Sequence, residues 1–288
     1  MDFELIHNLG GEKKMKLMKP YSRFLLCGLL MGALAGCAEK EQVLQNTESN
    51  PPTQAAQAAK VHWSYEGETS PEHWGELEED FGTCKVGKEQ SPIDIEAADV
   101  KKDTNLSPVE VDYSPSEVSL VNNGHTIQVN VSGENNHIVL EGKTYTLKQF
   151  HFHLPSEHEV GGKHDEMELH FVHKTEDGDT AVLGVLINGG AENAELNKLW
   201  SRLPQKESEE AVAIDGKFDL KALLPGDLHS YRYHGSLTTP PCTEGVQWIV
   251  LQQPVEWSEA QISAFRSIFP HDNRPVQPLD GRTLETEE

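Results

Sequence analysis

Three histidines at matching positions in two neighbouring segments could hold a metal ion. His151 and His153 lie in QFHFHLPSEHEV at 149–160, and His170 lies in MELHFVH at 167–173. Three imidazole ligands leave one position of tetrahedral zinc open for water, which is the arrangement of catalytic zinc sites. Any one of the chain's 14 histidines, taken alone, is better explained as a surface or core residue. The spacing of these three favours a catalytic metal site.

The strands that carry these histidines can bring them together. Alternate residues of a strand face the same side. An extended 148–153 segment therefore has two faces, one with Gln149, His151 and His153 and one with Lys148, Phe150 and Phe152, the second pointing mostly toward a core. Glu168, His170 and Val172 likewise share a face, and LPSEHEVGGKHDE at 154–166 can connect the two strands as a hairpin. Gln149 and Glu168 can then accept the outer ring N–H of a histidine ligand and fix its tautomer.

A competing interpretation makes Glu157 a metal ligand. HFHLPSE at 151–157 satisfies half of a cupin metal motif, which would indicate oxygenase or isomerase chemistry. The remainder of the motif is missing, because His164 stands where a glycine is expected and no P-x-G-x-x-H-x3-N sequence follows.

Short strands must supply most of the fold. Alternating or β-branched runs separated by turn residues predict strands within 118–133, 137–153, 166–175, 180–189 and 245–255. Helical patterns are few and lie at 191–203 and 258–269, where Ser258 and Gln261 fit a capping box. We expect a mainly β (α+β) fold, a single domain around a large, mostly antiparallel twisted sheet with a few peripheral helices.

Residues 1–36 resemble a lipoprotein-type signal peptide. A basic run at 13–23 precedes the apolar run FLLCGLLMGALAG at 24–36, which is too short for a stop-transfer helix. The sequence LAGC at 34–37 indicates cleavage before Cys37 and attachment of lipid to that cysteine. The alternative is cleavage nearby without a lipid.

The start of the chain and the residues after Cys37 complete the prediction of an exported protein. The acidic first residues do not fit a signal peptide, so the true start is expected at Met15 or Met18. Residues 37–60 are polar and aperiodic, as in a flexible tether, and 61–288 form the domain. We expect export to the periplasmic side of a Gram-negative envelope, and Ala38 after the cysteine favours a lipid anchor in the outer membrane.

Charge and cysteine content narrow the range of partners. The 288 residues carry a formal net charge of -23. Such a chain should repel nucleic acid and anionic lipid, so it should meet the membrane only through a lipid anchor. Cys84 and Cys242 are the one pair left outside the signal and lipid site. In an oxidising compartment they would form a disulfide, and the alternative is two buried thiols.

Further motifs accompany the histidines in a fixed order. They are QSPIDI (90–95), NNGHTI (122–127), YHGSLTTPPCTEGVQWIV (233–250) and NRPVQP (273–278). Together with the histidine segments they resemble the α-class carbonic anhydrases over about residues 62–282. The resemblance implies Zn2+ as cofactor and the reversible hydration of carbon dioxide to bicarbonate and a proton by hydroxide formed from zinc-bound water.

The resemblance also implies a role for individual residues. His151, His153 and His170 match the zinc ligands. Thr238 matches the hydroxyl that donates to Glu157 and accepts from the attacking hydroxide, with Thr239 beside it at the substrate position. His125 matches the proton shuttle. The sequence around it, taken without the family resemblance, would favour an ordinary exposed histidine in a turn. Other matches are Gln149 and Glu168 around the ligands, Val172, Val182, Leu237, Val246 and Trp248 on the apolar wall for carbon dioxide, and Tyr65, Asn122 and Gln128 on the water-ordering side.

Other expectations follow from the same family. Cys84 and Cys242 match a disulfide that tethers the loop of Thr238, and cis peptide bonds are expected before Pro92 and Pro241. Sulfonamides are expected inhibitors, and a homodimer is compatible with bacterial relatives. His158 and His173 are interpreted as structural. A non-catalytic relative that serves in binding is the remaining alternative, although the ligands, Thr238 and Glu157 are all present here.

Overall fold

A computed structural model describes residues 62–287. The signal peptide, Cys37 and tether predicted for 1–60 lie outside the described residues. No helix within 62–287 is long and apolar enough to cross a membrane. The helices are η1 (Gly67–Thr69), α1 (Trp74–Leu77), η2 (Glu79–Phe81), α2 (Thr83–Val86), α3 (Leu196–Trp200), η3 (Leu220–Leu223) and α4 (Glu259–Arg266).

Strands make up most of the ordered elements. They are β1 (Asp94–Ile95), β2 (Val100–Asp103), β3 (Glu110–Asp112), β4 (Val118–Asn122), β5 (Ile127–Val131), β6 (His137–Leu140), β7 (Lys143–His153), β8 (Glu159–Val160), β9 (Met167–Lys174), β10 (Thr180–Gly189), β11 (Val212–Ala213), β12 (Ser230–Ser236), β13 (Glu244–Leu251), β14 (Val255–Trp257) and β15 (Leu284–Glu287). The strands expected from the sequence are confirmed. Those not expected are mostly short, the exception being β12.

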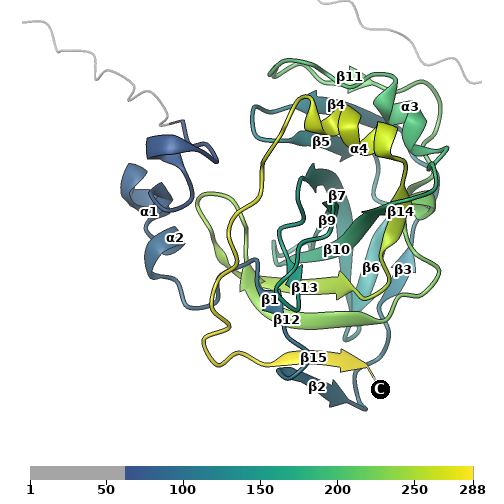
Figure 1. The fold of residues 1–288 in the computed structure, drawn as a ribbon. Coiled ribbons are helices and arrows are strands. Elements are labelled where there is room, and N and C mark those ends of the chain that lie inside the picture. Colours follow the sequence, from purple (N-terminus) through teal and green to yellow (C-terminus); the bar gives the residue numbers. More distant parts are fainter. Residues whose placement is uncertain (1–61, 288) are drawn as a thin grey trace, which may run out of the picture. The chain divides into compact units, whose positions relative to one another are not determined.

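A 13-stranded sheet organises the described residues (Figure 1). Its main path runs β11-β4-β5-β7-β9-β10-β13-β12-β15-β2, with β14 on β10, and with β6 joining β3 to β7. Most pairs are antiparallel, whereas β13 and β14 both run parallel to β10, and β2 runs parallel to β15. The prediction of a large, mostly antiparallel sheet is confirmed. The central strands β7, β9 and β10 lie side by side, and β7 and β9 carry the three histidines.

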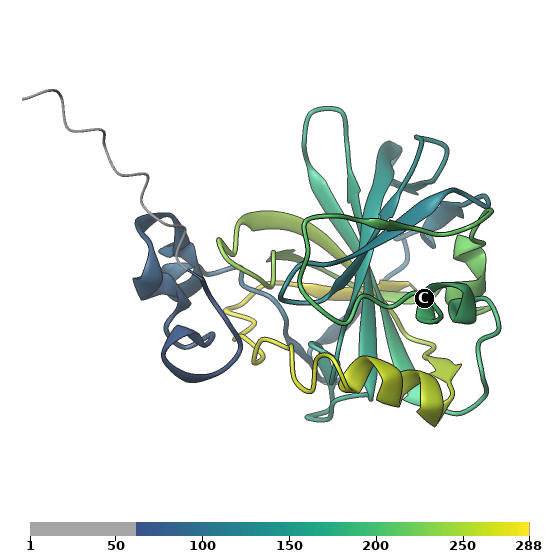
Figure 2. The ribbon, with the colours of Figure 1, turned by 90° about the horizontal axis from the view of Figure 1, so that it is seen from above.

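The peripheral helices are short and lie at two ends of the sheet. In both views α1 and α2 lie apart from α3 and α4 (Figures 1 and 2). The predicted capping box at the start of α4 is present, because Ser258 accepts from the backbone of Gln261 and the Gln261 side chain accepts from the backbone of Ser258. The helix expected over 191–203 is confined to Leu196–Trp200.

Side-chain alternation in β7 gives the sheet two different faces. Phe150 and Phe152 are fully buried in the main hydrophobic core, together with Leu169 and Phe171 of β9. The prediction for Lys148 is wrong, because this residue is exposed. The register with β9 shifts between Leu147 and Gln149, so an extra residue bulges out at Lys148 before the alternation resumes.

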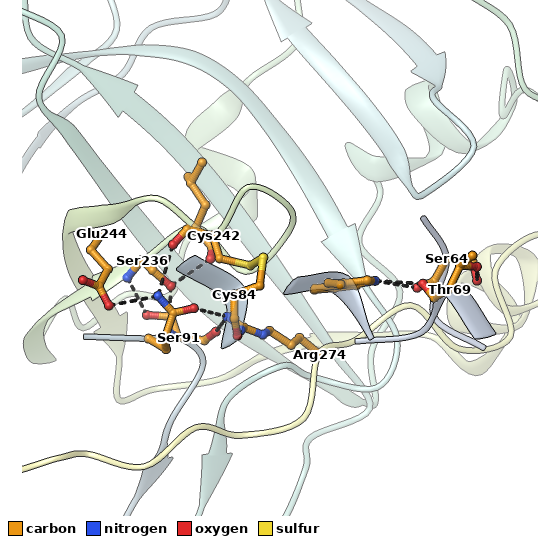
Figure 3. Close-up of a disulfide and its surroundings, with 11 residues drawn as sticks. Ser64, Thr69, Cys84, Ser91, Ser236, Cys242, Glu244 and Arg274 are labelled. Atoms are coloured by element: carbon orange, nitrogen blue, oxygen red, sulfur yellow. Dashed lines mark hydrogen bonds between the residues drawn. A yellow bond between two sulfur atoms is a disulfide. The ribbon is translucent and has the colours of Figure 1, made fainter. Parts of the chain in front are cut away.

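A disulfide joins Cys84 of α2 to Cys242 in the loop after β12 (Figure 3). The predicted bridge is therefore confirmed. Both sulfur atoms are buried in a small cluster with Trp74, against which Trp63 and Tyr65 pack. The bridge fixes the N-terminal helical segment to the loop that carries Thr238. The two expected cis peptide bonds, before Pro92 and Pro241, are also present, and Leu154–Pro155 is a third.

Removing the disulfide should destabilise the fold. The bridge closes a loop of 158 residues, which corresponds to about 5 kcal/mol in the chain-entropy model, an upper value for real proteins. We expect the Cys84→Ser/Cys242→Ser variant to unfold at a clearly lower urea concentration than the oxidised wild type. Urea titrations with and without a reducing agent would check this. Equal midpoints for variant, reduced and oxidised protein would contradict it.

Candidate active site

The three predicted histidines converge on one face of the sheet. His151 on β7 pairs directly with His170 on β9, and His153 pairs with Glu168. The ring centroids of the three histidines lie 4.7 to 5.3 Å apart. One nitrogen from each ring lies within 4.8 Å of the others, close enough to share one ion. The register of one hairpin is thus sufficient to assemble the cluster.

Hydrogen bonds at the outer ring nitrogens determine which nitrogens face the centre. Nδ1 of His151 lies 2.9 Å from Oε1 of Gln149. Nδ1 of His153 lies 2.7 Å from the carbonyl oxygen of Asp272, and Nε2 of His170 lies 2.9 Å from Oε1 of Glu168. Each acceptor requires a ring N–H, so the opposite nitrogen carries a lone pair. The inward donors are therefore Nε2 of His151, Nε2 of His153 and Nδ1 of His170.

The electrostatics of the cluster suit a metal ion. Burial lowers the pKa of all three histidines, and that of His153 falls to about 4. The rings are therefore neutral at pH 7, which a metal ligand must be. Nε2 of His153 is buried and has no hydrogen-bond partner among the described residues. A buried, unpaired lone pair is costly unless something bonds it, so these residues fit a divalent ion such as zinc.

Glu168 ties the cluster to a second, wholly buried network. Its Oε1 accepts from His170 and lies 2.7 Å from Nδ1 of His158, while its Oε2 accepts from the backbone N–H groups of Glu157 and His158. Nε2 of His158 lies 2.7 Å from the hydroxyl of Tyr233. His158, Glu168 and His170 could also be grouped as metal ligands. Because their atoms already hydrogen-bond to one another, we interpret them as support for His170.

Glu157 lies beside the histidines and holds the loop that follows β12. Its Oε2 lies 3.5 Å from Nε2 of His153 and 3.8 Å from Nδ1 of His170. Burial raises the pKa of Glu157 to about 7, while His170 and hydrogen bonds from Thr238 and from the Arg274 backbone oppose this rise. Among the described residues, Glu157 belongs to neither group that could share an ion. This geometry disfavours the cupin interpretation.

An apolar cluster borders the histidines on the same face. Val172 on β9 and Val182 on β10 pack with Val246 and Trp248 on β13, and Leu237 packs against them while partly exposed. The ring of Trp248 lies 4.9 Å from that of His170, centroid to centroid. All five residues assigned to the substrate wall from the sequence are thus in one place.

His125 lies in the turn between β4 and β5, in an aromatic stack. Its ring is parallel to that of Trp63 at 3.5 Å, and the ring of His62 lies 5.4 Å away. Burial, with a smaller contribution from the nearby imidazole of His62, lowers the pKa of His125 to about 4. In this conformation His125 is a weak proton acceptor.

The residues assigned to the water-ordering side have different surroundings. Asn122 is buried, donates to the carbonyl of Pro204 and accepts from the backbone of Gly124, so its side chain holds a turn. Gln128, opposite His151 in the sheet, donates to Asn130. The hydroxyl of Tyr65 is buried and has no partner among the described residues.

Sequence reasoning missed the contact of Asp272 and did not identify the partner of His158. Asp272 holds His153 through its backbone carbonyl, and no side-chain pattern signals such a contact. His158, interpreted as structural, is bonded to Glu168. Its position next to Glu157 indicated that it lies near the site. Its orientation could not be predicted, because the alternation of side chains in strands does not apply in the loop between β7 and β9.

Comparisons with known proteins agree with this site. Residues 69–288 match the family described as eukaryotic-type carbonic anhydrase. A carbonic anhydrase of Klebsiella pneumoniae is 50% identical over 225 residues, which cover 77% of this chain and 90% of that protein. The α-carbonic anhydrase of Thermovibrio ammonificans, solved with the inhibitor sulfanilamide, has a TM-score of 0.76 and 48% identity and covers 79% of this chain and 100% of its own.

A further solved relative has a different ligand. Dioscorin complexed with ascorbate is 31% identical, with a TM-score of 0.74, over 78% of this chain and 98% of its own. The match of the family over most of the described residues, and the bacterial relatives at about half identity, are nonetheless decisive. The chain belongs to the eukaryotic-type, or alpha, carbonic anhydrase family.

Proposed function

We propose that this enzyme catalyses the zinc-dependent, reversible hydration of carbon dioxide to bicarbonate and a proton. The observation that carries the proposal is the set of three inward imidazole nitrogens beside the Thr238–Glu157 pair. His151, His153 and His170 would hold the ion. Zinc supplies a Lewis acid that lowers the pKa of bound water from about 15.7 to roughly 7. Neutral imidazoles leave the charge of the ion uncancelled, which favours this effect.

Thr238 and Glu157 orient the attack on carbon dioxide. The threonine hydroxyl has one proton, and donating it to Glu157 leaves only lone pairs to face the incoming nucleophile. That constraint aligns the nucleophile without changing its charge. Thr239 is next along the loop, and its carbonyl accepts from the backbone of Cys242, which fixes the turn.

The apolar wall suits the substrate. Carbon dioxide has no net dipole, so it gains little from polar contacts and is best held against side chains such as Val172, Val246 and Trp248. His125 would take the proton that each turnover leaves and release it to solvent. His158 and Tyr233 would act only by supporting Glu168.

Metal removal tests the function directly. The purified domain should contain one zinc per chain and hydrate carbon dioxide in a stopped-flow pH-indicator assay. Dialysis against a chelator should abolish the activity, and zinc should restore it. A sulfonamide should inhibit the zinc form. A zinc-loaded protein with no activity above background would instead favour the non-catalytic binding alternative.

Trp63→Ala should raise the pKa of His125 from about 4 toward that of a free histidine. The stacked indole buries the imidazole and disfavours its charged form. A histidine that titrates near neutral pH exchanges protons better, so kcat in weak buffer should rise while kcat/KM stays constant. An NMR titration of the His125 ring would measure the pKa. His125→Ala is the control, and its kcat should be rescued by added imidazole. An unchanged pKa in Trp63→Ala would contradict the prediction.

We also propose export with cleavage before Cys37 and lipid attachment there, which places the enzyme on the periplasmic side of the outer membrane. The support is the sequence of residues 13–37, in which a basic run, an apolar run and a cysteine follow one another. Mass spectrometry of the mature N-terminus tests this. An unmodified N-terminus at another residue would contradict it.

A further inference from the structure

The side chain of Arg274 is almost completely buried, at 1% exposure, between the disulfide and the active site. Its guanidinium forms no ion pair with a described residue. It donates instead to Oε1 of Gln90 at 2.9 Å, the carbonyl of Ser91 at 2.8 Å and the carbonyl of Cys84 at 3.0 Å (Figure 3). Burying a cation without a carboxylate is expensive unless well-placed hydrogen bonds satisfy its N–H groups. The rigid five-donor fork of arginine can hold several acceptors at once, which lysine cannot.

These contacts attach Arg274 to both sides of the disulfide. The carbonyl of Cys84 accepts from Arg274 directly, and the carbonyl of Cys242 accepts from Nε2 of Gln90 at 3.1 Å. Gln90 thus bonds Arg274 with its oxygen and Cys242 with its nitrogen. The guanidinium carbon lies 5.8 Å from the ring centroid of Trp74. The two terminal nitrogens of the guanidinium are thus bonded to three acceptors, while Nε has no hydrogen-bond partner among the described residues.

The backbone of the same segment holds two residues of the active site. The N–H of Arg274 donates to Oε1 of Glu157 at 2.9 Å. Two residues earlier, Asp272 accepts from His153 through its carbonyl and from the N–H of Leu154 through its side chain, and its own N–H donates to the Leu154 carbonyl. Residues 272–274 have no helix or strand of their own to fix them. The Arg274 side chain anchors them in addition to the hydrogen bonds that Asp272 forms with His153 and Leu154.

We propose that Arg274 is a positioning residue for the hydration reaction. By fixing residues 272–274 against the disulfide-linked segments, it places its own N–H to hold Glu157, and Glu157 in turn orients Thr238. The inference rests on the proposed function. It also gives the disulfide a second connection to the site, through the carbonyl of Cys84, besides the loop of Cys242.

Arg274→Gln and Arg274→Lys test the proposal by their kinetics. Loss of a group that orients a reacting residue typically costs about 10- to 100-fold in activity. We expect kcat/KM for carbon dioxide to fall by about that factor in Arg274→Gln and by less in Arg274→Lys. In saturating buffer kcat should fall less than kcat/KM, because kcat also depends on the rate of proton release through His125, which the Arg274 variants should not change. A loss of folded protein alone would lower both values equally.

Arg282→Lys is the matched control. Arg282 also links the C-terminal part of the chain to Gln90, because its guanidinium donates to the carbonyls of Gln90, His234, Pro278 and Leu279. It forms no hydrogen bond with Glu157 or with a histidine ligand. Its variant should unfold more easily and keep kcat/KM within about twofold of wild type. If the two arginine variants lose kcat/KM equally, Arg274 has only a structural role.

Two further measurements do not depend on turnover. Amide hydrogen exchange of residues 272–274 should be faster in both Arg274 variants than in wild type or Arg282→Lys, and zinc release to a chelator should be faster because His153 is less firmly held. Adding Arg274→Gln to Glu157→Ala should cost much less kcat/KM than the same change costs in wild type, since Glu157 is no longer there to be positioned. The proposal would be overturned if the kcat/KM losses of the two single variants multiply in the double variant, or if amide exchange of residues 272–274 is unchanged in the Arg274 variants.

The outcomes separate this proposal from the function on which it rests. A zinc-loaded wild type with no hydration activity would refute the function, and amide exchange would still decide whether Arg274 holds residues 272–274. An active wild type with unchanged Arg274 variants would refute the positioning role alone. If Arg274→Gln does not fold, the exchange and kinetics of Arg274→Lys decide the question.

Discussion

His170→Ala should lose its zinc and show carbon dioxide hydration at the uncatalysed background. His170 supplies the one Nδ1 donor, from β9, opposite the two Nε2 donors from β7. Two imidazoles cannot complete the ligand set of catalytic zinc, which takes three protein ligands. Without the ion, the nucleophile is water with a pKa near 15.7 rather than roughly 7. The variant should still fold, because Glu168 keeps its bonds to His158 and to two backbone N–H groups.

Metal content by mass spectrometry and stopped-flow hydration would be measured on the same samples. His173→Gln is the matched control. His173 lies on the same strand, is fully buried, and hydrogen-bonds with Tyr113 on the other side of the sheet. It should lower stability but retain zinc and activity. A stoichiometric zinc content in His170→Ala, or loss of zinc in His173→Gln, would refute the ligand assignment.

The positions of these histidines were predictable because strand alternation is a local rule. Two residues on one strand and one on its hairpin partner share a face if the register is right, and the buried phenylalanines on the opposite face make any other register unfavourable. The bulge at Lys148 was not predictable, since it depends on how β7 pairs with β9. It lies before His151, so it does not disturb the ligands.

Contacts made by backbone atoms of distant segments were beyond sequence reasoning. The carbonyl of Asp272 reaches His153 across 119 positions, and the guanidinium of Arg274 reaches Cys84 across 190. Any residue has a carbonyl, so the amino-acid type gives no signal. The helix expected over 191–203 shows that local patterns can also predict too much. The sequence pattern favoured helix over the whole segment, but the folded protein has helix only at Leu196–Trp200.

Thr238→Ala should lower kcat/KM by about 100-fold while zinc remains bound, the scale of effect known for misplaced reacting groups. The three histidines and the residues that hold their outer nitrogens do not include Thr238, so the variant leaves the metal site unchanged. The variant loses the hydroxyl group that orients the nucleophile. Glu157 is buried and accepts from the backbone N–H of Arg274, and Thr238 is the side chain that donates to it. Without the hydroxyl, the nucleophile can rotate freely and attacks productively less often.

Thr238→Ser separates this role from packing. Serine keeps the donor and loses the methyl group of a side chain that is only 5% exposed, so its kcat/KM should lie within about tenfold of wild type. The loop itself should stay in place in both variants, because the Thr239 carbonyl, the disulfide at Cys242 and the bond from Leu237 to Thr243 hold it independently. If the serine variant is as slow as the alanine variant, the methyl contact matters and the hydroxyl does not. Retained zinc with slow turnover in alanine and recovery in serine is the result that only an orienting hydroxyl explains.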